Sequence, residues 1–176
     1  MFFNKKTNSS ENVAAAAPTS SDYMFIRNAL LVVDGSQPSL DATDFAVHFA
    51  KQTHCELSAA FVVDTATLDY LQQMRIFVKE ERQELEQDLE LKGKRYLTNV
   101  QALGRKYEVN IKAHICLGRF HQIILKLARE LAVDLIIIGG WKHEIKQKDS
   151  SSIERQLIMD LAECPVIVVK KTEERK

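Results

Sequence analysis

A short apolar run ends in two glycines at residues 134–140. The run reads Asp-Leu-Ile-Ile-Ile before Gly139 and Gly140, and it predicts a buried strand that leads into a turn. Glycines after a strand let the backbone approach a phosphate, and amide N–H groups at the start of a following helix can hold that anion. The next twelve residues, 141–152, contain no glycine. The segment therefore has the scaffold of a phosphate site, but the loop has a different composition.

The loop offers lysines and serines in place of glycines. Lys142, Lys146 and Lys148 could hold a phosphate as point charges, although a solvated loop is the commoner role of such lysines. The serines at 150–152 could be phosphorylated, but capping of the next helix through their hydroxyls is expected. Trp141 could stack on a base or cover an apolar edge, and the sequence leaves both alternatives open.

Five apolar runs alternate with helical patterns along the rest of the chain. They lie at about 29–33, 56–63, 109–116, 134–138 and 166–169. Because these runs are apolar on both faces, each is expected to be a strand covered from two sides. The alternation predicts an α/β fold with a parallel sheet and helices on both faces. In such sheets ligands bind beyond the carboxyl ends of the strands, where the strand order reverses.

A helical pattern follows the second of these strands, at about 68–107, and it is longer than the fold requires. Its apolar residues recur at helical spacing, and the charged stretch at 79–84 is expected to be a solvated face. Gly93 and Gly104 are candidates for a break and for the end of the helix. The additional amphipathic surface predicts a place where a partner could dock.

Charge and composition exclude several classes of function. Lys and Arg together number 24, as do Asp and Glu, so neither a nucleic-acid partner nor a membrane surface is expected. The three cysteines are far apart, without a Cys-x-x-Cys pair, and are expected to be reduced thiols. His114 and Cys116 share one face of a strand, but two ligands do not make a metal site. No arrangement of catalytic residues stands out, so no enzyme is expected.

The ends of the chain differ from its middle. Residues 1–24 are rich in Ser, Asn, Thr and Ala and predict a disordered tail. A single folded domain is expected at 25–171, followed by a charged tail at 172–176. The start of the chain lacks the apolar core of a signal peptide, and no run of about 18 apolar residues is present. A cytoplasmic location is therefore expected.

Three segments together resemble the universal stress protein family. They are 32–36, 134–139 and 164–169, and Gly118 leads a helix between the first two. What the resemblance implies is a five-stranded parallel sheet of order 3-2-1-4-5, a fold of the adenine-nucleotide alpha-hydrolase type. The resemblance also implies a homodimer that pairs through the last strand, formed by Val166, Ile167, Val168 and Val169. A valine-rich edge strand suits that role because it exposes backbone donors and acceptors.

The family's ATP-binding members carry Gly-x-x-Gly, nine further residues, and then Gly-Ser or Gly-Thr. In this chain Gly139 keeps the first position, while Lys142, Ser152 and Ile153 stand at the other three. The resemblance also places Asp34 where a carboxylate meets the nucleotide, and Val62 where the adenine packs. Both residues have plain structural roles as well, because Asp is common after a strand and Val is common in a core.

The chain resembles most the family branch that lacks the glycine motif and does not retain ATP. In that branch a Ser-Ser pair precedes Arg-Gln-Leu-Ile, as it does at 151–158. The expected function is therefore a cytosolic, non-catalytic module that regulates or protects during stress, with no cofactor required. One alternative is an adaptor that docks a partner through the long helix and the N-terminal tail. The other is an ATP- or AMP-binding switch or slow ATPase, with Mg²⁺, whose nucleotide would contact Asp34, Val62, Gly118, Gly139, Lys142 and Ser152.

Overall fold

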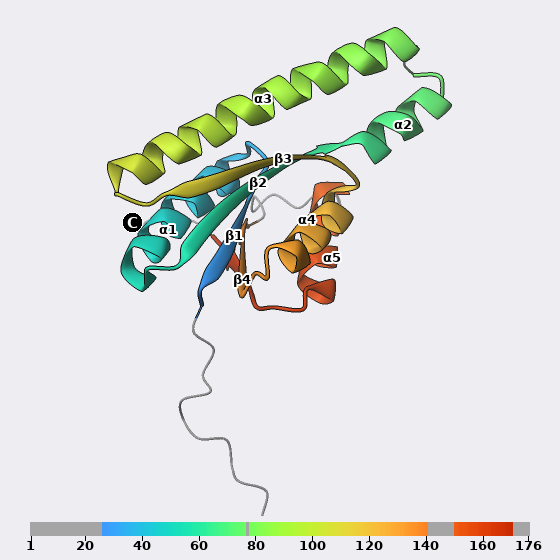
Figure 1. The fold of residues 1–176 in the computed structure, drawn as a ribbon. Coiled ribbons are helices and arrows are strands. Elements are labelled where there is room, and N and C mark those ends of the chain that lie inside the picture. Colours follow the sequence, from blue (N-terminus) through green and yellow to red (C-terminus); the bar gives the residue numbers. More distant parts are fainter. Residues whose placement is uncertain (1–25, 77, 141–149, 171–176) are drawn as a thin grey trace, which may run out of the picture.

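The computed structural model describes residues 26–76, 78–140 and 150–170, with the backbone alone at 150–152. The tails predicted at 1–24 and 172–176 lie outside the described residues. Five strands form one sheet, in the order β3-β2-β1-β4-β5, and every pair of neighbours is parallel (Figure 1). The predicted fold class and strand order are confirmed.

The helices and strands alternate as the sequence predicts, with small differences at their ends. The strands are β1 (Asn28–Val33), β2 (Glu56–Asp64), β3 (Ile111–Gly118), β4 (Leu135–Gly139) and β5 (Val166–Val169). The helices are α1 (Gln37–Thr53), α2 (Thr65–Gln73), α3 (Lys79–Lys106), α4 (Phe120–Glu130) and α5 (Ser150–Leu161). β3 begins two residues later than expected because the Val109 amide still donates to the carbonyl of Gly104 and closes the end of α3.

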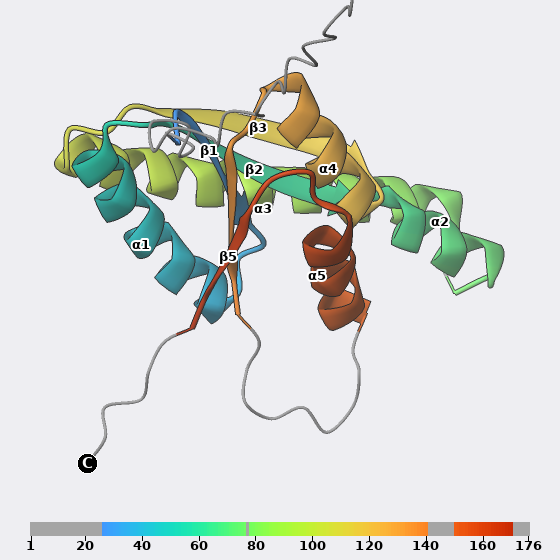
Figure 2. The same ribbon diagram turned by 90° about the horizontal axis from the view of Figure 1, so that it is seen from below.

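Both faces of the sheet are buried at the central strands β1, β2 and β4, which explains their continuous apolar runs. The edge strands β3 and β5 are partly exposed, so the expected cover from two sides is incomplete there. Alternate residues of β1 point to opposite sides: Leu31 packs with α1 and α3, whereas Leu30 packs with α4 and α5. Figure 2 shows these helix pairs on the two sides of the sheet. Leu30 and Leu31 are fully buried, as expected for a central strand of a parallel sheet. No described helix has the length and apolarity needed to cross a bilayer.

The single long helix predicted at 68–107 is wrong, because the chain turns back between α2 and α3. Arg75 has a left-handed backbone with φ of 58°, which a helix does not contain. α3 then starts afresh: the Glu81 carboxylate accepts from the Val78 amide at 3.0 Å, and acidic residues in a first turn favour a helix start. Gly93 is not a break. It lies inside α3, where an added Cβ would be 2.4 Å from the Phe61 ring, so glycine lets α3 approach the sheet.

The two helices on either side of this turn form an arm that extends beyond the sheet (Figure 1). We define the arm as residues 65–91. Leu68 is the buried residue of α2. Arg82 ties the helices together, since its Nε and Nη2 donate to Asp69 Oδ1 at 2.9 and 2.7 Å and its Nη1 donates to Glu86.

Candidate functional site

The strand order reverses between β1 and β4, and we call the region beyond the carboxyl ends of these two strands the crevice. From β1 the chain builds outward through β2 to β3, and then crosses to β4 and β5 on the other side. Ligands of open α/β sheets bind at this reversal, beyond the carboxyl ends of the strands. Asp34 follows β1 and Gly139 ends β4, so two of the predicted site residues flank the crevice.

Asp34 forms a turn that is held by hydrogen bonds within the chain. Its amide donates to Ser39 Oγ at 3.1 Å, and its Oδ1 accepts from the Ser36 amide at 2.9 Å. Ser36 is the N-cap of α1, and its Oγ accepts from the Ser39 amide at 3.3 Å. The ring of Tyr96 lies over Gly35, whose φ is 77°, so α3 covers the same turn.

The second oxygen of Asp34 pairs with an arginine from a distant helix. Arg155 Nη2, on α5, donates to Asp34 Oδ2. The Arg155 side chain is 10% exposed and that of Asp34 is 25% exposed, so the pair is largely buried. The predicted site did not include Arg155. The sequence could have pointed to Arg155, because it lies three residues before the fully buried Ile158 and therefore on the same helix face.

The residue before Arg155 contacts the neighbouring helix α4. Glu154 Oε2 accepts from the His121 amide at 2.8 Å and lies 2.7 Å from His121 Nδ1. His121 is in the first turn of α4 and is 8% exposed. Consecutive residues of α5 thus reach α4 and the end of β1, which joins three elements at the carboxyl end of the sheet.

Gly139 lies against the start of α1. A Cβ at this position would be 2.5 Å from the Pro38 carbonyl carbon, 2.6 Å from the Pro38 oxygen and 2.6 Å from the Ser39 nitrogen. All three are backbone atoms, so no side-chain rotation could make room. Glycine is therefore required here by the packing of β4 against α1, whether or not a phosphate is bound.

Val62 follows Phe61, the sheet partner of Val33, and so lies beside Asp34, whereas Gly118 lies one strand further out, beside Asp64. Val62 is 7% exposed and belongs to the core cluster under α4 and α5. Gly118 ends the edge strand β3, which β2 separates from β1. Its φ is 137°, a region that favours glycine, and an added Cβ would be 2.9 Å from Ile123. Each residue therefore has a structural role that needs no ligand.

The remaining predicted site residues are Lys142 and Ser152, and the structure does not describe their side chains. Lys142 lies outside the described residues, as do Trp141, Lys146 and Lys148. Ser152 is in the first turn of α5, but its side chain is outside the description. The role of these residues stays a prediction.

The described cysteine and histidine side chains do not form a reactive centre. Burial raises the pKa of the Cys116 thiol and of the Cys164 thiol, which keeps both protonated and weakly nucleophilic. Burial also lowers the pKa of His114, which favours the neutral ring. Within the described ranges, no three His, Cys, Asp or Glu residues come together as a metal site.

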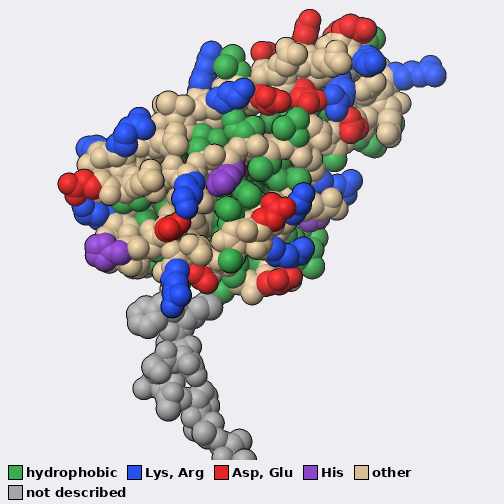
Figure 3. Space-filling view, in the orientation of Figure 1, with side chains coloured by type: hydrophobic (Ala, Val, Ile, Leu, Met, Phe, Trp, Pro, Cys, Tyr) green, Lys and Arg blue, Asp and Glu red, His purple; other side chains and the backbone are tan. Residues whose placement is uncertain are grey.

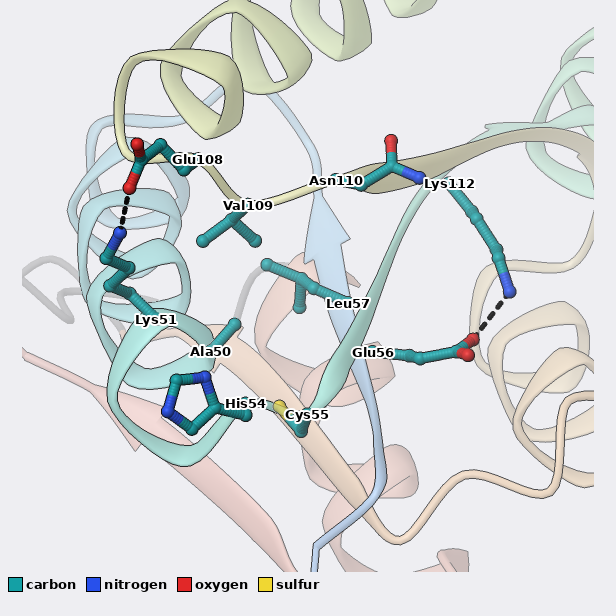
Figure 4. Close-up of a pocket in the computed structure, with 10 residues that line it drawn as sticks. All are labelled: Ala50, Lys51, His54, Cys55, Glu56, Leu57, Glu108, Val109, Asn110 and Lys112. Carbon is teal, nitrogen blue, oxygen red and sulfur yellow. Dashed lines mark hydrogen bonds and ion pairs between the residues drawn. The ribbon is translucent and has the colours of Figure 1, made fainter.

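A hollow of about 480 Å³ lies at the opposite end of the strands from the crevice, near the amino ends of β2 and β3 (Figure 4). Its charged residues neutralise one another in two ion pairs, Lys51 with Glu108 and Lys112 with Glu56. Lys51 lowers the pKa of Glu108 through this bond. None of the predicted site residues lines this hollow, so it is a weaker candidate for the predicted site than the crevice.

Comparison with known proteins agrees with the geometry. The model of the universal stress protein family matches residues 26–170. The universal stress protein YxiE of Bacillus subtilis is 28% identical over 148 residues, which are 80% of this chain and 97% of that protein. The structure is similar to universal stress protein UspA from Lactobacillus plantarum, with a TM-score of 0.67, 24% identity, and coverage of 82% of this chain and 98% of the other.

A further solved structure, that of the universal stress protein from Archaeoglobus fulgidus in complex with dAMP, shares the fold. Its TM-score is 0.58 at 16% identity, over 84% of this chain and all of the other. The family match spans most of the chain, including the crevice between β1 and β4. The chain belongs to the universal stress protein family.

Proposed function

We propose that this protein is a cytosolic, non-catalytic binding module of the stress response that does not retain ATP. Gly139 is the observation that carries the proposal. It is the one glycine left of the ATP motif, and the packing of β4 on α1 already requires it. Its presence is therefore no sign of phosphate binding. Lys142 and Ser152 stand at glycine positions and cannot offer the close backbone approach that glycine allows. Ile153 stands at the Ser or Thr position and has no hydroxyl.

The test is calorimetric titration of the purified protein with ATP and Mg²⁺, together with mass spectrometry for any nucleotide that copurifies. We expect no bound nucleotide and no binding heat at micromolar concentrations. A clear micromolar Kd, or ATP released from the purified protein on denaturation, would remove the proposal.

A second candidate function is a nucleotide switch or slow ATPase. The dAMP complex of the similar Archaeoglobus fulgidus protein supports this candidate, as does the position of Asp34 at the crevice. In this role Asp34 would accept hydrogen bonds from the nucleotide and Lys142 would contact its phosphate. The candidate predicts that Asp34→Asn weakens AMP or ATP binding by well over tenfold in a folded variant. An unchanged Kd would argue against the switch.

The arm supports a third role, that of an adaptor. Four of its apolar side chains are 58–59% exposed: Tyr70, Met74, Ile76 and Val78. Residues 79–91 carry six acidic and two basic side chains, a net charge of −4, and Figure 3 shows acidic groups along the arm. Exposed apolar groups beside a charged face are typical of interaction surfaces, and the negative charge favours a basic partner.

The adaptor role predicts that serines at Tyr70, Met74 and Val78 abolish the capture of stress-specific partners by the tagged protein. Leu161→Ser is a suitable control, because Leu161 is 52% exposed on α5, away from the arm. If the triple variant captured the same partners as the wild type, the arm would not be the docking surface.

We also propose a homodimer that pairs through β5. In the described residues this strand pairs with β4 on one side, and its four residues, Val166–Val169, are half-buried. An apolar edge strand is stabilised by pairing with another strand. Light scattering after size exclusion should give about twice the chain mass of 20.1 kDa. A monomer mass at micromolar concentration would contradict the dimer.

A further inference from the structure

The crevice contains a buried cation that the chain itself supplies. Arg155 reaches from α5 to Asp34 at the end of β1. With a side chain 10% exposed, the guanidinium depends on an anionic partner, because an unpaired charge is costly to remove from water. Asp34 is one such partner, at the place where the strand order reverses.

Both carboxylate oxygens of Asp34 have donors already. Oδ1 accepts from the Ser36 amide, and Oδ2 accepts from Arg155. A carboxylate oxygen can accept more than one hydrogen bond, but a sugar hydroxyl entering the crevice would have to reach an oxygen beside the bound guanidinium. It would then compete with the guanidinium, whose full positive charge adds a Coulomb attraction to the carboxylate that a neutral hydroxyl lacks.

Glu154 holds Arg155 in place. It bonds to the His121 amide and ring, so the first half of α5 is tied to α4 as well as to β1. Arg155 therefore cannot leave Asp34 simply by a movement of α5, unless the contact between Glu154 and His121 also breaks. A side chain anchored in this way is organised before any ligand arrives.

We propose that Arg155 is the specificity-determining residue that excludes nucleosides and nucleotides from the crevice by occupying Asp34. The inference rests on the proposed function in that both take this crevice as the place where a nucleotide would lie. It goes further because it assigns the exclusion to one side chain, rather than to the substituted glycine positions.

The test is titration of AMP, by calorimetry, into the wild-type protein, Arg155→Met and Arg155→Gln, each confirmed as folded by circular dichroism. Arg155→Gln retains a polar side chain and serves if Arg155→Met does not fold. Arg129→Met is the matched control, since it removes one arginine from an exposed ion pair with Glu163 on the same side of the sheet. We expect both Arg155 variants to bind AMP at least about tenfold more tightly than the wild type, and the control to be unchanged.

The outcomes separate the inference from the proposed function. If folded Arg155 variants bind AMP no better than the wild type, the inference is overturned while the proposed function stands. If the wild type binds AMP and ATP tightly and the Arg155 variants bind them more weakly, Arg155 is a ligand of the nucleotide and both ideas fail. If the wild type binds tightly and the variants bind more tightly still, the inference holds and only the proposed function is lost.

Discussion

A methyl group at Gly139 provides a quantitative test of how β4 packs on α1. In Gly139→Ala the new Cβ would lie 2.5–2.6 Å from three backbone atoms of Pro38 and Ser39. Overpacking of this kind costs about 1–3 kcal/mol, and the upper half of that range applies because backbone has to move. The smaller conformational entropy of the unfolded chain returns about 0.4–1 kcal/mol. The net loss in the free energy of unfolding should be about 2 kcal/mol.

The neighbouring glycine is the control. In Gly140→Ala the nearest atoms are the Lys170 Cγ at 2.8 Å and the Val169 oxygen at 3.0 Å. These atoms lie at the end of the edge strand β5, where a small shift is easier, so the loss should stay below about 1 kcal/mol. Urea unfolding followed by circular dichroism measures both values. A loss below about 0.5 kcal/mol for Gly139→Ala would refute the packing explanation and strengthen the case for a ligand role of this glycine.

Three other substitutions test separate parts of the structure. Asp34→Ala should lower the free energy of unfolding by about 3 kcal/mol because it removes a carboxylate partner of the buried Arg155 guanidinium. Adding Arg155→Met should recover at least half of that loss, and a loss below about 1 kcal/mol for Asp34→Ala would show that the pair is not buried in solution. His114 has a depressed pKa in the folded state, so the unfolded chain takes up the proton first as the pH falls. Protonation of His114 therefore costs no stability above about pH 6.5, and it destabilises the fold increasingly as the pH falls below that value. His114 Nε2 is also without a hydrogen-bond partner among the described residues, so His114→Leu should raise stability at pH 7 by about 1 kcal/mol and flatten the loss below pH 6.5. If the stability of the His114→Leu variant depended on pH as that of the wild type does, His114 would not be the cause of the loss of stability below pH 6.5. Arg82→Met should speed hydrogen exchange of the α2 amides with little effect on global unfolding, whereas Lys126→Met, in an exposed pair on α4, should leave α2 exchange unchanged. Equal exchange in both variants would mean that Arg82 does not hold the arm together.

The fold could be predicted from the sequence because the type of each helix and strand depends on the pattern of residues within its own segment. Each strand carries an apolar run such as 134–138, and each run alternates with a helical pattern, so element type and order follow from periodicity. The break between α2 and α3 was not predicted, because helical spacing continues on both sides of it. The turn depends on Arg75 in a left-handed conformation and on a new helix start near Glu81, and neither leaves a glycine or proline in the sequence.

The sequence by itself determined which residues occupy the positions of the phosphate motif, and it pointed to Asp34 and Gly139 at the ends of strands. Only the tertiary structure decided what those residues do. Asp34 and Arg155 are 121 positions apart, so their pairing depends on how α5 packs over the sheet. Gly139 faces the backbone at Pro38 and Ser39 for the same reason. Contacts between distant segments arise from packing that no local pattern records, and in this protein those contacts give both Asp34 and Gly139 partners within the chain.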